Sequence, residues 1–137
     1  MIFGIGTDIV HVERMRKNLD KHGDNFAQRI LTKAEFIEFE NKKDKAAFIA
    51  KRFAAKEAAV KAMGTGFSQG LSLHHIGVEH DNAGKPILAF LDVAESFLQE
   101  KKIKQAHLSL ADERDYAVSF VTALVRVNSA LLTPAQR

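Results

Sequence analysis

Two carboxylates and a lysine are the residues of this chain whose types and spacing best suit chemistry. Asp8 follows an apolar stretch interrupted by two glycines, and Glu57 stands four residues before Lys61 in an alanine-rich stretch. On a helix, this spacing places Glu57 and Lys61 on one face, a turn apart. Mg²⁺ typically takes one or two protein carboxylates with water and phosphate oxygens, and a lysine can neutralise phosphate charge that the metal does not reach. These residues therefore predict a site for Mg²⁺ and a phosphate group.

Each of the three residues also has a purely structural interpretation. Glu57 and Lys61 would form an exposed ion pair worth roughly 0.3–0.5 kcal/mol, and Asp8 could cap a helix beginning at Val12. The surroundings favour chemistry, because a carboxylate and an ammonium on an alanine-rich helix face are costly when buried without partners. We therefore expect this helix face to border a cleft.

The composition excludes several other kinds of site. The 137 residues include no Cys, so disulfides, a thiol nucleophile and thiolate metal sites are excluded. The histidines do not follow HExxH or another zinc spacing, and no GxSxG motif is present. The glycine-rich segment 64–70 follows a helix and lacks the GxxxxGK[ST] pattern of a phosphate-binding loop. A metal in this chain is therefore expected to be bound by oxygen or imidazole.

A small α+β fold is expected to position these residues. Residues 2–10 predict a buried strand with Gly4, Gly6 and Asp8 on one side, and the longest helix is expected from its cap Asp44 to Met63. The other expected elements are a helix from 12 to 23, an apolar connector at 26–31, a helix capped by Thr32 and Glu35, strands at 71–79 and 87–91, a helix capped by Asp92 and Glu95, and strands at 105–110 and 116–127. Helices first and hairpins later favour an antiparallel sheet packed on a long central helix, in one domain spanning 1–137.

The charges are distributed unevenly along the chain. The net charge is +3 overall, but residues 1–68 carry +4, and seven of the basic residues fall between Lys42 and Lys61. A solvated face is the commoner explanation, and an anionic partner is the functional one. No stretch approaches the roughly 20 apolar residues that span a bilayer, and the first residues do not read as a signal peptide. We expect a cytoplasmic protein without a membrane segment.

Four sequence segments, taken together, are far more specific than the composition of the chain. They are GIGTDIV at 4–10, RFAAKEAAVKAMGTG at 52–66, GKP at 84–86 and HLSL at 107–110. In their order and spacing, over about residues 1–126, they closely resemble the short type of 4′-phosphopantetheinyl transferase, the holo-[acyl-carrier-protein] synthase family. The resemblance implies transfer of the 4′-phosphopantetheine arm of coenzyme A to a serine of apo-acyl carrier protein, with release of adenosine 3′,5′-bisphosphate.

The resemblance also implies roles for particular residues. Asp8 and Glu57 would bind Mg²⁺, and Lys61 would contact the coenzyme A phosphates, which makes these three the catalytic residues. Short members are homotrimers that hold coenzyme A at the subunit interface, and the residues expected to line that pocket are Arg52, Gly64, Gly84, Pro86 and His107. The acidic carrier would dock on the first helix, and the residues expected there are Arg14, Met15, Lys17 and Lys21. The acceptor of the serine proton stays open between Glu57 and a metal-bound water.

The chain departs from the family pattern in two places. Many relatives carry a second histidine where this chain has the turn 110–114, and Asp112 cannot take over its role unchanged. Residues 128–137 run past the usual end of the family as a tail.

Two other functions compete with this interpretation. A basic nucleic-acid-binding module is disfavoured by the single Tyr, the absence of Trp and the lack of a recognised motif. A Mg²⁺-dependent phosphohydrolase would use the same carboxylates with water as the nucleophile.

Overall fold

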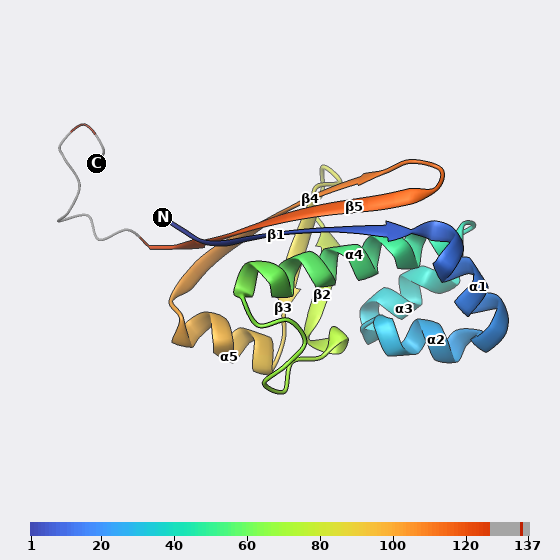
Figure 1. Cartoon of the computed structure of the whole chain (residues 1–137), viewed down its shortest axis with the longest axis horizontal. Coiled ribbons are helices and arrows are strands. Elements are labelled where there is room, and N and C mark those ends of the chain that lie inside the picture. Colours follow the sequence, from blue (N-terminus) through green and yellow to red (C-terminus); the bar gives the residue numbers. More distant parts are fainter. Residues whose placement is uncertain (127–134, 136–137) are drawn as a thin grey trace.

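A long helix, α4 (Lys45–Met63), runs through the middle of the computed structural model, which describes residues 1–126 and Ala135 (Figure 1). The remaining elements are β1 (Ile2–His11), α1 (Val12–His22), α2 (Asp24–Ile30), α3 (Lys33–Glu40), the 3₁₀ turn η1 (Leu73–His75), β2 (Ile76–His80), β3 (Pro86–Phe90), α5 (Val93–Glu100), β4 (Ile103–Asp112) and β5 (Tyr116–Val125). The predicted combination of helices and antiparallel strands is confirmed. The tail predicted at 128–137 lies outside the described residues, apart from Ala135.

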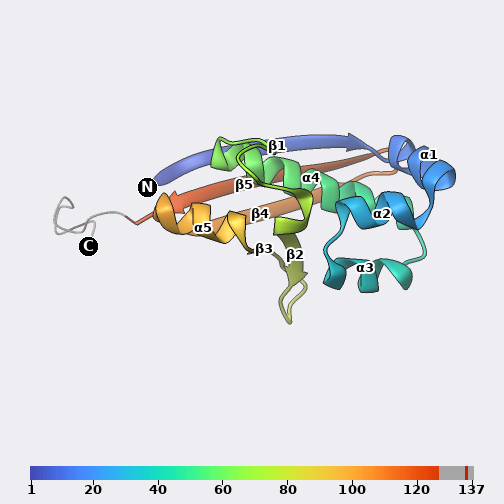
Figure 2. The same ribbon diagram turned by 90° about the horizontal axis from the view of Figure 1, so that it is seen from below.

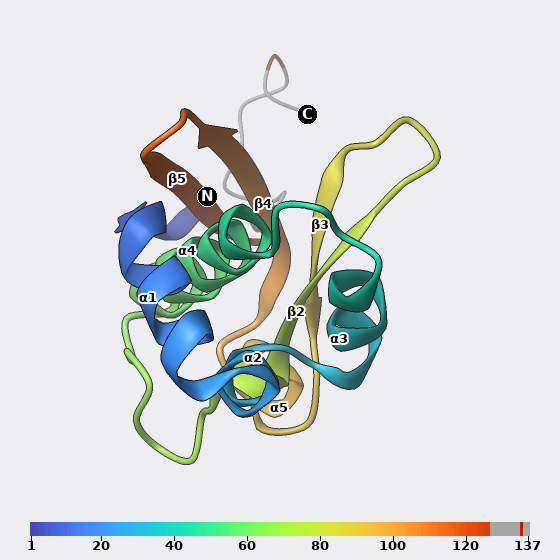
Figure 3. The same cartoon turned by 90° about the vertical axis from the view of Figure 1, so that its right-hand side faces the viewer.

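The strands form two separate sheets on different sides of α4. β1, β5 and β4 pair in that order as an antiparallel three-stranded sheet, whereas β2 and β3 form an antiparallel hairpin. Figure 3 shows α4 between the three-stranded sheet and the group formed by α3 and the hairpin. Figure 2 shows the hairpin projecting away from the three-stranded sheet. The long helix is therefore covered on both sides, which explains why most of its residues are buried.

The ends of α4 are set by the residues predicted to set them. The Asp44 side chain accepts a hydrogen bond from the backbone N–H of Ala47 at 3.1 Å, which satisfies a donor that the first turn leaves free. Gly64 ends the helix in the left-handed conformation, with φ of 79°, where glycine has no Cβ penalty. The helix thus begins and ends as the sequence predicts.

Two glycines of β1 allow this strand to lie directly against α4. A Cβ atom at Gly4 would overlap the carbonyl oxygen of Ala62, and one at Gly6 would overlap that of Ala58. Because both obstacles are backbone atoms, only glycine permits this approach. The close contact brings Asp8, the next residue on the same face of β1, to the surface of α4.

The other face of β1 is exposed, contrary to the prediction of a buried strand. Ile5 is 59% exposed and Ile9 is 62% exposed, because both point away from α4. Neighbouring residues of β5 continue this apolar surface, since Ile9 pairs with Val118 and Thr7 pairs with Phe120. We call this surface the open sheet face; its exposed apolar residues are Ile5, Ile9, Tyr116, Val118 and Phe120.

Other predicted elements differ in detail. The apolar connector at 26–31 is largely helical, as α2, because its apolar side chains pack against neighbouring helices. The strand predicted at 71–79 begins only at Ile76, after η1. Asp92 precedes α5 but makes no side-chain capping bond, since its backbone adopts a φ of 49°. Within the described part of the chain, no helix is long and apolar enough to cross a membrane.

Candidate active site

The structure brings Asp8, Glu57 and Lys61 together where β1 crosses α4. The Lys61 ammonium donates to Asp8 Oδ1 at 3.0 Å and to the carbonyl oxygen of Thr7 at 2.9 Å. The recorded ion pair of Lys61 is thus with Asp8 from a distant strand, and not with Glu57 on its own helix. Asp8 does not cap α1, because that helix has no side-chain capping bond. The structure thus pairs Lys61 with Asp8 in place of the Glu57–Lys61 pair and the Asp8 cap, and the metal and phosphate site stays a prediction.

The electrostatics of this site favour the binding of a cation. Partial burial raises the pKa of Glu57, and the negative charge of Asp8 raises it further. The positive charges of Lys61 and Arg14 oppose this rise without cancelling it. Two carboxylates thus share a site in which the second negative charge is unfavourable, and a bound cation would relieve that repulsion.

The donor set matches Mg²⁺ better than a metal that needs a full protein cage. In the described residues, no group of three or more His, Cys, Asp or Glu side chains is placed to hold a metal ion. Two carboxylates are sufficient for Mg²⁺, which fills its remaining positions with water and substrate phosphate oxygens. Asp8 and Glu57 therefore fit as its protein ligands, and Lys61 lies beside them as a phosphate-binding cation.

The other residues predicted to contact coenzyme A do not join this cluster within one chain. Gly64 follows Glu57 by about two helical turns, at the end of α4. Gly84 and Pro86 belong to the projecting β2–β3 hairpin. His107 is exposed on β4, opposite Thr122, on the side of the sheet that faces away from α4. In the single chain, these residues are therefore spread over the end of α4, the hairpin and β4.

Arg52 has a different environment from the one predicted for it. Its side chain is 4% exposed and its guanidinium lies 3.2 Å from Glu38 and 3.4 Å from Glu35. The guanidinium also lies over the ring of Phe48, 4.4 Å from its centre. Since its charge is already matched inside the chain, we leave Arg52 out of the site proposed below.

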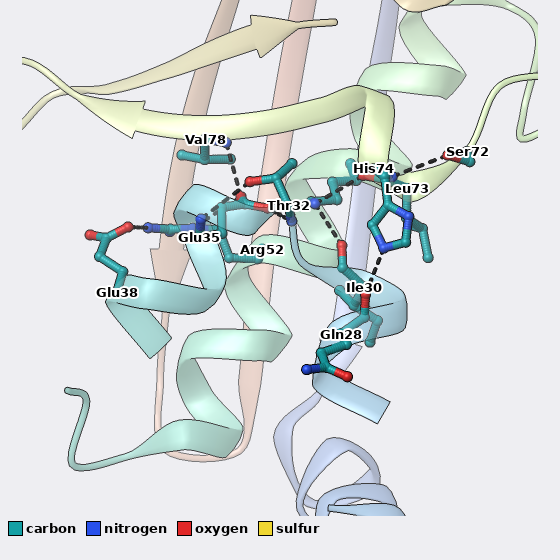
Figure 4. Close-up of polar contacts among 11 residues, drawn as sticks. Gln28, Ile30, Thr32, Glu35, Glu38, Arg52, Ser72, Leu73, His74 and Val78 are labelled. Carbon is teal, nitrogen blue, oxygen red and sulfur yellow. Dashed lines mark hydrogen bonds and ion pairs between the residues drawn. The ribbon is translucent and has the colours of Figure 1, made fainter. Parts of the chain in front are cut away.

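The sequence analysis missed a buried ion cluster between α4 and α3 (Figure 4). The Lys56 ammonium is fully buried and lies 2.6 Å from Glu35 Oε1. Burial lowers the pKa of Lys56, an effect that the Glu35 carboxylate opposes. The sequence revealed the capping box of Thr32 and Glu35, which the structure confirms. It gave no signal that the same carboxylate also binds a lysine 21 residues later.

The residues predicted for carrier docking are divided between surface and core. Arg14, Lys17 and Lys21 are exposed on α1. Met15 is only 3% exposed and packs in the core beneath α1, so the structure removes it from the predicted docking surface.

The turn that contains Asp112 is fixed to its neighbours. Asp112 lies 4.0 Å from the Lys51 ammonium of α4, and the carbonyl oxygen of Asp115 accepts a bond of 2.8 Å from the backbone N–H of Val12. Asp112 thus ties the end of β4 to α4, beside the start of α1.

Comparison with known proteins places this site in a family. The model of the 4′-phosphopantetheinyl transferase superfamily matches residues 4–121. The holo-[acyl-carrier-protein] synthase of Azoarcus sp. (strain BH72) is 48% identical over 126 residues, which cover 92% of this chain and 100% of the relative. The crystal structure of the synthase from Neisseria meningitidis superimposes with a TM-score of 0.87 at 44% identity, covering 90% of this chain and 99% of that one.

A further structure is described as a complex. The holo-(acyl-carrier-protein) synthase from Bacillus anthracis str. Ames, in complex with CoA (3′,5′-ADP), matches with a TM-score of 0.77 at 38% identity and covers 92% of this chain and 99% of that one. The fold and the site thus define a phosphopantetheinyl transferase. The chain belongs to the holo-[acyl-carrier-protein] synthase family.

Proposed function

We propose that this chain is a single transferase domain that moves the 4′-phosphopantetheine group from coenzyme A to a serine of apo-acyl carrier protein, releasing adenosine 3′,5′-bisphosphate. The observation that carries the proposal is the meeting of Asp8, Glu57 and Lys61 at the crossing of β1 and α4. Family membership supplies the reaction, and a relative of the same fold binds coenzyme A or its bisphosphate product.

In this proposal the chain works by positioning and charge neutralisation, as phosphoryl transfer requires. Asp8 and Glu57 would hold Mg²⁺, whose charge neutralises the pyrophosphate oxygens and stabilises the leaving bisphosphate when it is bound. Lys61 would bind a further phosphate oxygen, because its ammonium is half-exposed and lies on the same surface. The bonds that Lys61 makes to Asp8 and Thr7 hold its flexible side chain at the site.

Mass spectrometry of the carrier tests the proposed reaction directly. The protein is incubated with coenzyme A, Mg²⁺ and apo-acyl carrier protein, and the carrier is expected to gain the mass of one phosphopantetheine. A parallel sample with excess chelator should show no gain. Release of free phosphopantetheine without a modified carrier would instead support the phosphohydrolase. Salt-sensitive binding of RNA without any transfer would support the nucleic-acid-binding module.

We propose α1 as the docking site for the carrier. Its basic residues Arg14, Lys17 and Lys21 are exposed, and their charge complements the strongly acidic carrier expected for this family. The charge of Arg14 also acts on Glu57, which means that α1 borders the proposed metal site. A carrier bound on this helix would therefore present its serine next to Glu57.

Reversing two charges on α1 is expected to weaken binding of the carrier and to leave binding of coenzyme A unchanged. Lys17→Glu with Lys21→Glu should raise the KM for the carrier by about tenfold at low salt, because complementary charge speeds association, and leave the KM for coenzyme A unchanged. Steady-state kinetics with each substrate varied in turn would measure this. Lys101→Glu with Lys102→Glu, at the end of α5, makes the same change in net charge and should have no effect on either KM. Equal effects of the two double variants would contradict a docking site on α1.

We propose that three copies of the chain assemble through the open sheet face. This surface is apolar and exposed in the single chain, and exposed apolar patches of this kind are typical of interfaces. His107 lies on the same side of the sheet, whereas Asp8 faces α4. Assembly through this face would therefore place His107 at the subunit interface, where the coenzyme A pocket is expected.

A charge on the open sheet face should prevent this assembly. Ile9→Lys is expected to reduce the molar mass in solution to that of one chain and to lower transfer activity at least about tenfold, because a buried unpaired charge is costly. Ile37→Lys on α3 is the matched control, since Ile9 is 62% and Ile37 64% exposed. Light scattering after size exclusion would measure the mass. A trimer that survives Ile9→Lys, or one that Ile37→Lys breaks equally, would place the interface elsewhere.

A further inference from the structure

The glycine-rich loop after α4 starts and finishes on the same face of that helix. We call residues 64–72 the GTG loop. At its start, the backbone N–H groups of Thr65 and Gly66 donate to the carbonyl oxygen of Val60 at 3.2 and 3.3 Å. At its end, the carbonyl oxygen of Leu73 accepts a bond of 3.0 Å from the Lys56 ammonium. Lys56 and Val60 are one turn apart, about 6 Å along the helix axis, so the loop is closed on α4.

The two anchors of the GTG loop are the sequence neighbours of two site residues. Lys56 precedes Glu57 and Val60 precedes Lys61. A rotation of about 100° per residue turns the anchors toward the core and the site residues toward β1. One stretch of helix thus fixes both the metal-binding face and the loop that carries Gly64.

Lys56 is itself held rigidly in three directions. Its ammonium has three protons, and the structure gives it three acceptors: Ile30 O at 2.6 Å, Glu35 Oε1 at 2.6 Å and Leu73 O at 3.0 Å. Glu35 is fixed in turn by the backbone N–H groups of Thr32 at 2.9 Å and Val78 at 3.0 Å. Figure 4 shows that these partners belong to four different elements, α2, α3, η1 and β2. The end of the loop is therefore tied to a point that cannot shift without breaking several buried bonds.

We propose that Lys56 is a positioning residue for coenzyme A: by holding Leu73, it fixes the end of the GTG loop that follows Lys61 and Gly64 on the chain. The proposal rests on the proposed function for its substrate. Lys56 is completely buried, so it acts through the loop and not by touching the substrate. Without this bond, Leu73 would lose its link to α4, and the end of the loop would depend on the buried side chain of Leu71 and on the contact of His74 Nε2 with the carbonyl oxygen of Gln28 at 2.6 Å.

The test compares two variants that differ in the loop anchor. Glu35→Gln removes the ion pairs of Glu35 with Lys56 and Arg52 but keeps Lys56 and its bond to Leu73. Lys56→Met with Glu35→Gln removes the anchor as well and leaves no buried carboxylate unpaired. The double variant is expected to raise the KM for coenzyme A about tenfold, the cost of losing a bond to a charged group, with little change in kcat at saturation. Glu35→Gln alone should leave the KM close to that of the unmodified protein.

Hydrogen–deuterium exchange provides a second measurement that does not depend on activity. In the protein without coenzyme A, the backbone amides of 65–73 should exchange faster in the double variant and at the unmodified rate in Glu35→Gln. This comparison still tests the anchor if the unmodified protein transfers no phosphopantetheine, an outcome that would overturn the proposed function alone. Equal KM and exchange in the two variants would overturn the proposal for Lys56. If the double variant does not fold, Lys56→Gln with Glu35→Gln, which also leaves no buried carboxylate at position 35, is compared with Glu35→Gln by the same two measurements.

Discussion

Glu57→Gln is expected to lower kcat/KM for phosphopantetheine transfer by about a thousandfold or more, because it removes a proposed Mg²⁺ ligand and its negative charge. The loss should persist at raised Mg²⁺, and it is measured as the rate of mass gain by the carrier. Glu79→Gln, an exposed glutamate on β2, is the control and should keep full activity. Near-normal turnover of Glu57→Gln at ordinary Mg²⁺ would contradict the proposed metal site.

The same substitution should stabilise the protein when no metal is bound. Burial and the charge of Asp8 raise the pKa of Glu57 above its ordinary value of 4.5, so the folded state holds this proton more tightly than the unfolded state. As pH rises above 4.5, Glu57 ionises at a cost to the folded state, and its contribution to the free energy of unfolding falls. Glutamine does not ionise and escapes this cost.

Urea unfolding in the presence of a chelator would measure this effect. The stability advantage of Glu57→Gln should be present at neutral pH, shrink as pH falls toward 4.5, and be absent well below it, where Glu57 is protonated in both states. An unmodified protein that is the more stable of the two at neutral pH without metal would contradict the electrostatics described for the site. A gain in stability with a loss of activity is typical of a residue kept for its chemistry.

Gly6→Ala is expected to destabilise the fold by about 3 kcal/mol or more, because the added Cβ overlaps the backbone of α4 and β1 must move away. The same movement would separate Asp8 from Glu57 and Lys61, so activity should fall further than the folded fraction does. Urea unfolding and transfer kinetics on the same preparations would measure both effects.

Gly77→Ala is a matched control for this substitution. A Cβ at Gly77 would lie 3.5 Å from the nearest atom, a side-chain carbon of Thr32, which is an ordinary contact. Its stability and activity should therefore stay close to those of the unmodified protein. If Gly6→Ala were tolerated equally well, the close approach of β1 and α4 would not be what positions Asp8.

The sequence predicted the parts of this molecule that local rules determine. The cap at Asp44 and the glycine stop at Gly64 define α4, and the alternation of Gly4, Gly6 and Asp8 gave the correct common face of β1. Such features depend on neighbours within a few residues, where dihedral preferences and side-chain periodicity leave little choice.

Features that depend on tertiary packing were not predictable in the same way. The pairing of Lys61 with Asp8 joins residues 53 positions apart, and helical spacing suggested Glu57 instead. Met15 was expected at the surface and lies in the core, because the apolar stripe of α1 faces the protein interior. Periodicity shows which residues share a face, but it does not show what that face packs against.

The contact between β1 and α4 also restricts which second mutations could restore activity to a variant substituted at Gly6. The atoms that a side chain at Gly6 would meet are the backbone oxygen of Ala58 and the backbone nitrogen of Ala62. No change of side chain on α4 removes a backbone atom, so a second-site suppressor cannot arise by trimming the opposing residues. Rescue would have to shift the whole helix, together with the Glu57 and Lys61 side chains that it carries. A screen for suppressors of a Gly6 variant should therefore return reversion to glycine far more often than compensation.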